Sequence, residues 1–299
     1  MTHDADLDVV VVSYESAHLL NTCLDSLAAA RGDLAMTVTV ADNASTDGSA
    51  ALVRARSDDT QVIEMGRNTG FSCANNAAIA AGSARHVLVL NPDTVVAPGA
   101  LSTLVDFADQ HPRAGVVAPR LLNADGSPQL TARAFPTPAA ALFGRRSPVT
   151  QWFPGNRWSR RFLVEREHLG EAAFTVDWVS GAAMLVPRAV IESVGGFDEA
   201  FFLFWEDADW CRRICDAGHE VWCVPAAVVV HDEGGTRAHG WTPRTIRHFH
   251  TGAYRYWTKH HAPQPWNPLR YGAAGLLGAR AAALTVTTRL HHQLERTVR

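Results

Sequence analysis

The sequence predicts an α/β protein in which helices cover both faces of an open, mostly parallel sheet, followed by a basic helical segment. Three observations support this fold class. Continuous apolar runs rich in β-branched residues, such as residues 8–13 and 86–90, are typical of strands buried on both faces of a parallel sheet. Apolar stripes at helical spacing separate these runs. A chain of 299 residues, 47% of them hydrophobic, can form one large domain with an appendage.

The first half of the chain alternates between strand and helix patterns. The expected strands are residues 8–13, 36–41, 61–65, 86–90 and 115–118. The expected helices have an apolar stripe over 19–27, begin near Ser49, and cover 72–81 and 98–110. This alternation favours a Rossmann-like open sheet, which binds ligands at the carboxyl ends of its strands. Asp42 and Asp93 lie at two such ends.

The second half is less regular in pattern. Residues 121–130 contain a hairpin signal, and 133–175 are irregular, which is typical of a functional lid or a mobile loop. Ordered structure is expected again over residues 176–187. Beyond it we expect helices at 188–194, after 206, at 242–261 and at 269–298, with strands at 221–224 and 228–230 and a linker at 263–268.

Charge is distributed unevenly along the chain. Residues 237–299 hold ten basic residues, one acid and seven of the fourteen histidines, whereas residues 1–236 hold 17 basic and 29 acidic residues. A basic segment favours contact with an anionic partner, such as lipid head groups, a diphosphate or nucleic acid, although a solvated tail has the same composition. The last helix has no uninterrupted run of 18 apolar residues, so we expect an interfacial helix or an ordinary packing or dimerisation helix rather than a membrane span.

The N-terminus and the cysteines indicate a reducing compartment. Met1 to Asp8 carry three aspartates and no apolar stretch, so no signal peptide is expected and a cytoplasmic setting follows. Five cysteines form no disulfide framework and are expected to be reduced thiols. A zinc site is the alternative for one cluster, which comprises Cys211, Cys215, His219 and Cys223.

The most unusual stretch places three carboxylates between Trp205 and Trp210. Glu206, Asp207 and Asp209 resist burial together unless they are paired, and their repulsion can make one of them a proton acceptor. The alternative is that they only offset the macrodipole at the first turn of a helix.

Polar residues elsewhere suit a nucleotide diphosphate. Asp42 can accept hydrogen bonds from a base, and Arg67 can meet a phosphate while Gly70 allows close backbone approach. Asp93 and His231 can ligate Mg²⁺ or Mn²⁺, which would neutralise a leaving diphosphate. Each residue alone also has an ordinary interpretation, as a turn or a strand-end side chain.

Seven collinear stretches carry a resemblance to a known family. They are residues 11–14 (VVSY), 41–49 (ADNASTDGS), 67–76 (RNTGFSCANN), 90–93 (LNPD), 180–185 (SGAAML), 195–199 (GGFDE) and 204–211 (FWEDADWC). In these seven stretches the sequence resembles glycosyltransferase family 2 enzymes of the GT-A fold, especially bacterial rhamnosyltransferase-like members. The resemblance implies a GT-A nucleotide-sugar domain over 1–235 and a basic helical extension over 236–299.

The resemblance also implies a role for each matching residue. Asp207 is expected to be the catalytic base, Asp93 and His231 to hold the metal, and Trp205 and Glu206 to bind the acceptor. One departure is Asn91, which stands where the family's first metal-binding aspartate usually lies. The expected nucleotide-sugar-binding residues are Ser13, Tyr14, Glu15, Asp42, Asn43, Arg67, Asn68, Gly70 and Asn91.

The implied reaction is an inverting, metal-dependent transfer of a sugar onto a saccharide hydroxyl. The resemblance favours dTDP-L-rhamnose as donor and a lipid-linked saccharide as acceptor, in cell-wall or surface polysaccharide synthesis. Residues 237–299 would then meet the inner face of the membrane or form a homodimer, and no nucleic acid is expected. The alternatives are another donor, such as a UDP-sugar for galactofuranosyl or hexosyl transfer, and a non-catalytic nucleotide-binding scaffold. A dehydrogenase is disfavoured, since no Gly-x-Gly-x-x-Gly follows the first strand.

Overall fold

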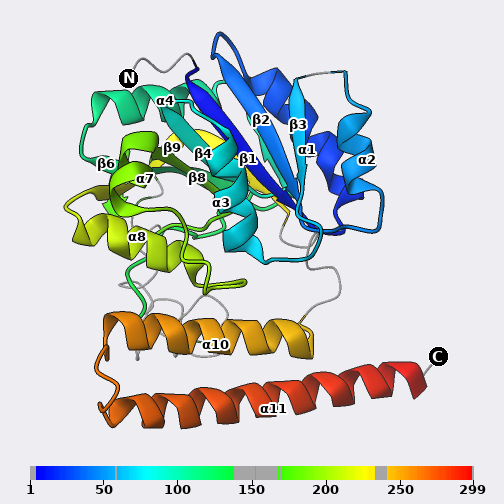
Figure 1. Cartoon of the computed structure of the whole chain (residues 1–299), viewed down its shortest axis with the longest axis vertical. Coiled ribbons are helices and arrows are strands. Elements are labelled where there is room, and N and C mark those ends of the chain that lie inside the picture. The colour runs from blue at the N-terminus through cyan, green and yellow to red at the C-terminus, as the bar shows by residue number, and fades with distance from the viewer. Residues whose placement is uncertain are drawn as a thin grey trace.

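A computed structural model describes residues 5–57, 59–137, 152, 168, 170, 172–232 and 241–297, with side chains as far as Arg289. The chain forms an α/β body, and two long helices lie beneath it (Figure 1). Most of the segment 133–175 that we expected to be a lid or mobile loop lies outside the described residues.

One mixed sheet forms the centre of the body. Its strands are β1 (Leu7–Ser13), β2 (Met36–Asp42), β3 (Thr60–Glu64), β4 (His86–Leu90), β5 (Thr94–Val96), β6 (Ala114–Leu122), β7 (Phe174–Val176), β8 (Ala183–Pro187) and β9 (Glu220–His231). Their order is β3-β2-β1-β4-β8-β6-β9-β5, and β7 pairs with β9. Most register pairs are parallel, while β8 runs antiparallel to both of its neighbours.

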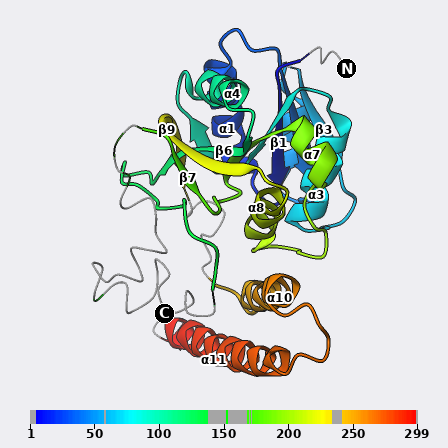
Figure 2. The same cartoon turned by 90° about the vertical axis from the view of Figure 1, so that its left-hand side faces the viewer.

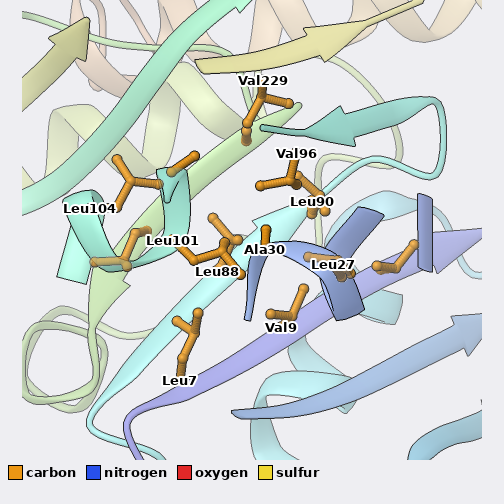
Figure 3. Close-up of a cluster of buried hydrophobic side chains, with 14 of the residues drawn as sticks. Leu7, Val9, Leu27, Ala30, Leu88, Leu90, Val96, Leu101, Leu104 and Val229 are labelled. Carbon is orange, nitrogen blue, oxygen red and sulfur yellow. The ribbon is translucent and has the colours of Figure 1, made fainter. Parts of the chain in front are cut away.

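Helices cover both faces of the sheet, as the alternating pattern predicts. They are α1 (Ala17–Ala30), α2 (Ser49–Arg54), α3 (Phe71–Ala81), α4 (Ala100–Gln110), α7 (Arg188–Val194) and α8 (Glu206–Asp216). Successive residues of β1 point to opposite faces, so Leu7 and Val9 pack with α1 and α4 (Figure 3), whereas Val10 packs with α3 and α8. All seven β1 residues are buried, which confirms the two-sided burial expected of this strand.

The structure corrects two sequence expectations about strands. The segments 221–224 and 228–230 are parts of one strand, β9, because its pairing with β6 continues past a register shift opposite Pro119 and Arg120. The short strand β5 was not predicted; it pairs with β9 so that Thr94 lies opposite His231. The expected hairpin is present, since Leu122 pairs with Pro128 across a turn.

The C-terminal segment forms an antiparallel helical hairpin of α10 (Pro243–His260) and α11 (Leu269–Thr297), seen obliquely from one end in Figure 2. Thr242 caps α10, because its hydroxyl accepts a hydrogen bond from the Thr245 backbone N–H. Within the described part of the chain, no helix is both long and apolar enough to cross a membrane. Tyr256 of α10 is buried in the same cluster of core side chains as Val10, so α10 packs against the body. The domain boundary at residue 235 stays a prediction.

The cysteines are free thiols in the structure. Burial raises the pKa of Cys211, and it also raises the pKa of Cys215, to about 11. Among the described residues, no group of three or more His, Cys, Asp or Glu side chains is arranged to hold a metal ion. The zinc alternative for Cys211, Cys215, His219 and Cys223 therefore finds no support.

Candidate active site

The carboxyl ends of three parallel strands bring candidate residues to one edge of the sheet. Ser13 at the end of β1 lies opposite Asp42 at the end of β2. Asn91 follows β4, and its backbone N–H donates to the Ala182 carbonyl at 2.9 Å. Because β8 runs antiparallel to β4, its N-terminal end, preceded by Gly181, lies at this same edge.

Asp42 is buried and presents an acceptor. Its Oδ2 accepts the Ser45 backbone N–H at 3.0 Å, which closes the turn after β2. Its buried Oδ1 has no hydrogen-bond partner among the described residues. A buried acceptor without a partner costs about 1–3 kcal/mol, so this atom suits a ligand that brings an N–H donor, such as a pyrimidine base.

Hydrogen bonds join the loop that follows β1 to the loop that follows β2, beside Asp42. Glu15 Oε1 accepts the Thr46 backbone N–H at 2.8 Å, and the Glu15 N–H donates to the Ser45 hydroxyl at 3.0 Å. Glu15 itself has a positive φ of 52°. The structure therefore gives Glu15 a scaffold role in this loop pair, while direct contact with a nucleotide stays a prediction.

Asn43 fixes the loop that carries Asn68 and Gly70. Its side-chain N–H donates to the Gly70 carbonyl at 3.1 Å, and its Oδ1 accepts the Thr69 backbone N–H at 2.8 Å. Asn68 Oδ1 accepts the Gly70 N–H at 3.1 Å. The side-chain amide of Asn43 is therefore hydrogen-bonded to the loop backbone, and Asn43 holds this loop in position.

Gly70 is required by its own backbone and by a neighbour. Its φ is 90°, and a Cβ atom there would lie 2.5 Å from the Phe202 carbonyl oxygen. The next residue, Phe71, donates its N–H to that oxygen at 2.7 Å. The close approach expected of Gly70 is thus made to the segment that precedes α8. Arg67 and Tyr14 are exposed at the same edge of the fold, and their contacts with a ligand stay predictions.

Asp93 and His231 lie together, as a shared metal site requires. Asp93 Oδ1 is 3.2 Å from His231 Nε2, and both side chains are buried. His231 Nδ1 donates to Gln129 Oε1 at 2.9 Å, and the Gln129 amide in turn donates to the His231 carbonyl. This pairing fixes the tautomer and leaves the Nε2 lone pair facing Asp93.

Two protein ligands match the way Mg²⁺ and Mn²⁺ bind nucleotides. Such ions commonly take one or two protein ligands and complete their coordination with phosphate oxygens and water. The residues present therefore fit a divalent ion carried by a diphosphate. Asn91 Nδ2 lies 3.4 Å from His231 Nε2, so Asn91 adjoins the pair without adding a carboxylate.

Asp207 lies in the first turn of α8 after a strained turn. Phe204 and Trp205 both have positive φ, 72° and 75°, which costs about 1–3 kcal/mol for each residue. The Trp205 ring packs between Phe249 and Tyr256 of α10, with centroids 5.5 Å from each. The strained backbone is thus held by α10 and delivers the carboxylate toward β8.

Two backbone N–H groups orient the Asp207 carboxylate. Gly181 donates to Oδ2 at 3.1 Å and Ala208 donates to Oδ1 at 2.8 Å. Burial raises the pKa of Asp207 above its usual range, and these N–H groups and the Arg133 charge only partly oppose that effect. A buried carboxylate with a raised pKa is a stronger base than an exposed one.

The acidic cluster divides into three roles. Asp209 is fully buried and accepts bonds from Lys259 and His260, which anchor α10 to α8, and from Arg213 of its own helix. Although burial alone would raise the Asp209 pKa, these donors lower it. Asp209 is therefore structural. Glu206 is buried beside Asp207 at the start of α8, and its contact with an acceptor stays a prediction.

Sequence reasoning missed Gln129 and Arg133. Both belong to the stretch after β6, for which only a hairpin and an irregular segment were expected. Arg133 lies over the Trp178 ring at 5.0 Å and acts on Asp207 through its charge. A glutamine 102 residues from the histidine it orients leaves no local pattern, so only the fold reveals the pair.

Comparisons with known proteins agree with this geometry. Residues 8–171 match the family model for glycosyl transferase family 2. The chain is 32% identical to the N-acetylglucosaminyl-diphospho-decaprenol L-rhamnosyltransferase of Mycobacterium tuberculosis, over 92% of this chain and 91% of that protein. It is 26% identical to the low-salt glycan biosynthesis hexosyltransferase Agl10 of Haloferax volcanii, over 70% of this chain and 61% of that protein.

Solved structures confirm the GT-A-type fold. The mannosyltransferase PcManGT from Pyrobaculum calidifontis, in complex with GDP-Man and Mn²⁺, has a TM-score of 0.57 at 20% identity and covers 97% of this chain and 81% of its own. GalNAc-T7 with UDP, GalNAc and Mn²⁺ has the same TM-score at 13% identity, over 92% of this chain and 54% of its own. Sequence motifs, sheet order and the family match agree, and the chain belongs to glycosyltransferase family 2.

Proposed function

We propose that this glycosyltransferase moves L-rhamnose from dTDP-L-rhamnose onto a hydroxyl of a lipid-linked saccharide, with inversion at the anomeric carbon. The observation that carries the proposal is the half-buried Asp207 carboxylate, oriented by Gly181 and Ala208 at the edge where Asp42, Asp93 and His231 gather. The name of the mycobacterial relative, a rhamnosyltransferase acting on N-acetylglucosaminyl-diphospho-decaprenol, supports the choice of donor and acceptor.

The nucleotide would bind over the ends of β1 and β2. Asp42 Oδ1 would accept an N–H of the base, and the loop fixed by Asn43 would lie against the ribose and phosphates. Arg67 is exposed beside this loop and supplies a cation for phosphate oxygens. Ser13, Tyr14 and Asn91 would complete the donor site at the strand ends.

The diphosphate would reach Asp93 and His231. A divalent ion bound there would neutralise charge on the leaving diphosphate. Two solved structures with a similar fold contain Mn²⁺, which supports a metal of this class. The chain's own part is to hold His231, through Gln129, in the tautomer that leaves Nε2 without a proton.

Asp207 would act on the acceptor from the other side of the sugar. A carboxylate has about four lone-pair positions, and the two backbone N–H groups use only part of them, so an acceptor hydroxyl can still donate to Asp207. The hydroxyl proton passes to Asp207 while its oxygen bonds to the anomeric carbon. The bond from that carbon to the diphosphate breaks, and the diphosphate leaves with the electron pair. One displacement inverts the configuration.

The C-terminal hairpin would meet the membrane surface that carries the acceptor. Trp266, Tyr271 and Leu276 are each more than 70% exposed on or just before α11. Exposed aromatic and aliphatic side chains next to arginines are typical of helices that lie at a lipid interface. A dimer contact through the same helix is the competing explanation.

A donor screen with product analysis tests the proposal. The purified protein would be given dTDP-L-rhamnose, UDP-sugars and GDP-sugars, with Mn²⁺ or Mg²⁺ and a polyprenyl-diphosphate-linked N-acetylglucosamine. We expect transfer from dTDP-L-rhamnose, with the product anomer inverted by NMR. Transfer only from a UDP- or GDP-sugar would replace the donor, a retained anomer would exclude Asp207 as a simple base, and nucleotide binding without any transfer would favour the scaffold alternative.

A further inference from the structure

An open groove of about 1040 Å³ separates the two C-terminal helices from the segment that leads into α8. One wall is residues 198 and 200–203, the floor is one side of α10, and the other wall is α11, whose lining residues recur at helical spacing of three or four. In Figures 1 and 2, α8 lies on the side of the body that faces α10. The groove is lined chiefly by Phe202, Arg247, Arg255, Arg270, Leu277 and Gly278.

The charge of the groove is positive. Four basic side chains line it, those of Arg247, Arg255, Lys259 and Arg270, against a single carboxylate, Asp198. Asp198 is already paired with Lys259 at 2.7 Å, so it does not neutralise the arginines. Arginine guanidinium groups bind phosphate oxygens in a bidentate manner, and several of them together suit a ligand with more than one negative charge.

The rest of the lining is apolar and leaves room for a chain. Phe202, Leu203 and Leu277 are half-buried along the walls. The Phe202 ring stacks on His248 with centroids 4.4 Å apart, which holds it in place. On α11 the groove meets Gly278, and a Cβ there would have nothing within 4 Å. Cations beside an apolar channel match an amphipathic anion.

The groove adjoins the transfer centre through one wall. The carbonyl of Phe202 accepts the Phe71 N–H beside the donor loop, while the Phe202 ring lines the groove. The same segment continues through Phe204 and Trp205 to Asp207, and the Phe204 carbonyl lies against Gly252, on the groove floor. A ligand in the groove would therefore present its next group toward the base.

We propose that this groove binds the diphosphate and the first isoprenoid units of the lipid-linked acceptor. The arginines would take the diphosphate, and the channel between Phe202 and Leu277 would take the start of the hydrocarbon chain. This places the saccharide of the acceptor at Asp207 and the rest of the lipid along α11, toward the membrane. The inference rests on the proposed lipid-linked acceptor.

Gly278→Leu tests the groove by filling it. The side chain enters open space, and leucine is a better helix former than glycine, so the fold should be kept. The matched control is Gly272→Leu, which also enters open space but lies outside the groove. The measurement is the ratio of kcat/KM for a polyprenyl-diphosphate-linked saccharide to kcat/KM for the same saccharide on a short alkyl group.

We expect Gly278→Leu to lower this ratio about 10-fold or more, because displacing a few buried CH₂ groups accounts for that much. Gly272→Leu should keep the ratio of the unaltered protein. Equal ratios in the two variants would overturn the groove assignment. Arg247→Glu should lower the ratio in the same direction through charge, and an unchanged ratio would remove Arg247 from the diphosphate site.

Direct binding separates this proposal from the proposed function. If the unaltered protein transfers sugar to neither acceptor, the proposed function fails, and binding of undecaprenyl diphosphate in detergent still tests the groove. Weaker binding by Gly278→Leu than by Gly272→Leu supports it, and equal binding contradicts it. If Gly278→Leu instead loses binding to phosphatidylglycerol vesicles that lack any polyprenyl diphosphate, the groove holds a membrane head group, which also contradicts the proposal.

Discussion

The contact of α10 with the strained turn before Asp207 leads to a sharp prediction. Gly252 lets the helix approach that turn, because a Cβ there would lie 2.9 Å from both the Phe204 carbonyl oxygen and Trp205 Cδ1. Gly252→Ala must therefore push the turn away by a few tenths of an ångström to reach an ordinary contact distance. Asp207 follows Trp205 by two residues, so it moves with the turn.

The expected magnitude follows from two opposing effects. Overpacking costs about 1–3 kcal/mol, while replacing glycine by alanine in a helix returns up to about 1 kcal/mol. The net loss of stability should thus be small, at most about 2 kcal/mol. A carboxylate displaced by part of an ångström should lose about 10-fold in kcat, since a displacement of 1 Å can cost about 10²-fold.

The assay compares kcat, the dissociation constant of the donor and the melting temperature. The matched control is Gly272→Ala on α11, where a Cβ meets nothing within 4 Å and stability should rise slightly. We expect Gly252→Ala to lower kcat and to leave donor binding unchanged. If its kcat equals that of the control, α10 does not position the base, and the reasoning from the strained turn fails.

Four further predictions concern residues at the edge of the sheet. Asp42→Ala should weaken binding of the nucleotide about 10-fold or more, because a hydrogen bond to a charged group contributes about 1.5–3 kcal/mol. Unchanged affinity by calorimetry would show that Asp42 does not bind the nucleobase. Gln129→Leu should raise the Mn²⁺ concentration needed for half-maximal activity about 10- to 100-fold by releasing His231, and an unchanged metal titration would show that Gln129 does not support a metal ligand. Because burial raises the pKa of Asp207, the acid limb of kcat should lie above the usual carboxylate range. Asp207 stabilises the fold fully at pH values below its pKa in the unfolded chain, and this stabilisation is lost as the pH rises through its higher pKa in the folded protein. Asp207→Asn should therefore raise the melting temperature at neutral pH but not in strong acid. A lower melting temperature at neutral pH would contradict the burial argument.

The sequence predicted those features that depend on local pattern. The continuous run of β1, the turn after β2 and the helix that begins at the carboxylates of 206–209 can each be recognised from a few neighbouring residues. The alternation of strands and helices sufficed to predict an open, mostly parallel sheet and the edge on which Asp42 and Asp93 both lie. Periodicity and turn chemistry are local properties, so they can be read without coordinates.

Features that depend on distant contacts could not be predicted. Gln129 is significant only because β9 brings His231 to it, and Gly252 only because α10 packs on the turn before α8. β5 is only three residues long, and it is recognised as a strand because it pairs with β9. Asn43 is expected to contact the nucleotide sugar, and the sequence did not reveal that its amide also fixes the loop at Gly70. In each case the partner lies far away along the chain.

The central claim, that Asp207 takes the acceptor proton, is tested most directly by Asp207→Asn in the rhamnosyl transfer assay, with the donor dissociation constant measured on the same protein. Asparagine keeps the size of the side chain but cannot accept the proton. The account predicts that turnover falls about 10²-fold or more while donor binding stays unchanged. Turnover equal to that of the unaltered protein, at equal donor affinity, would contradict the assignment of Asp207 as the base.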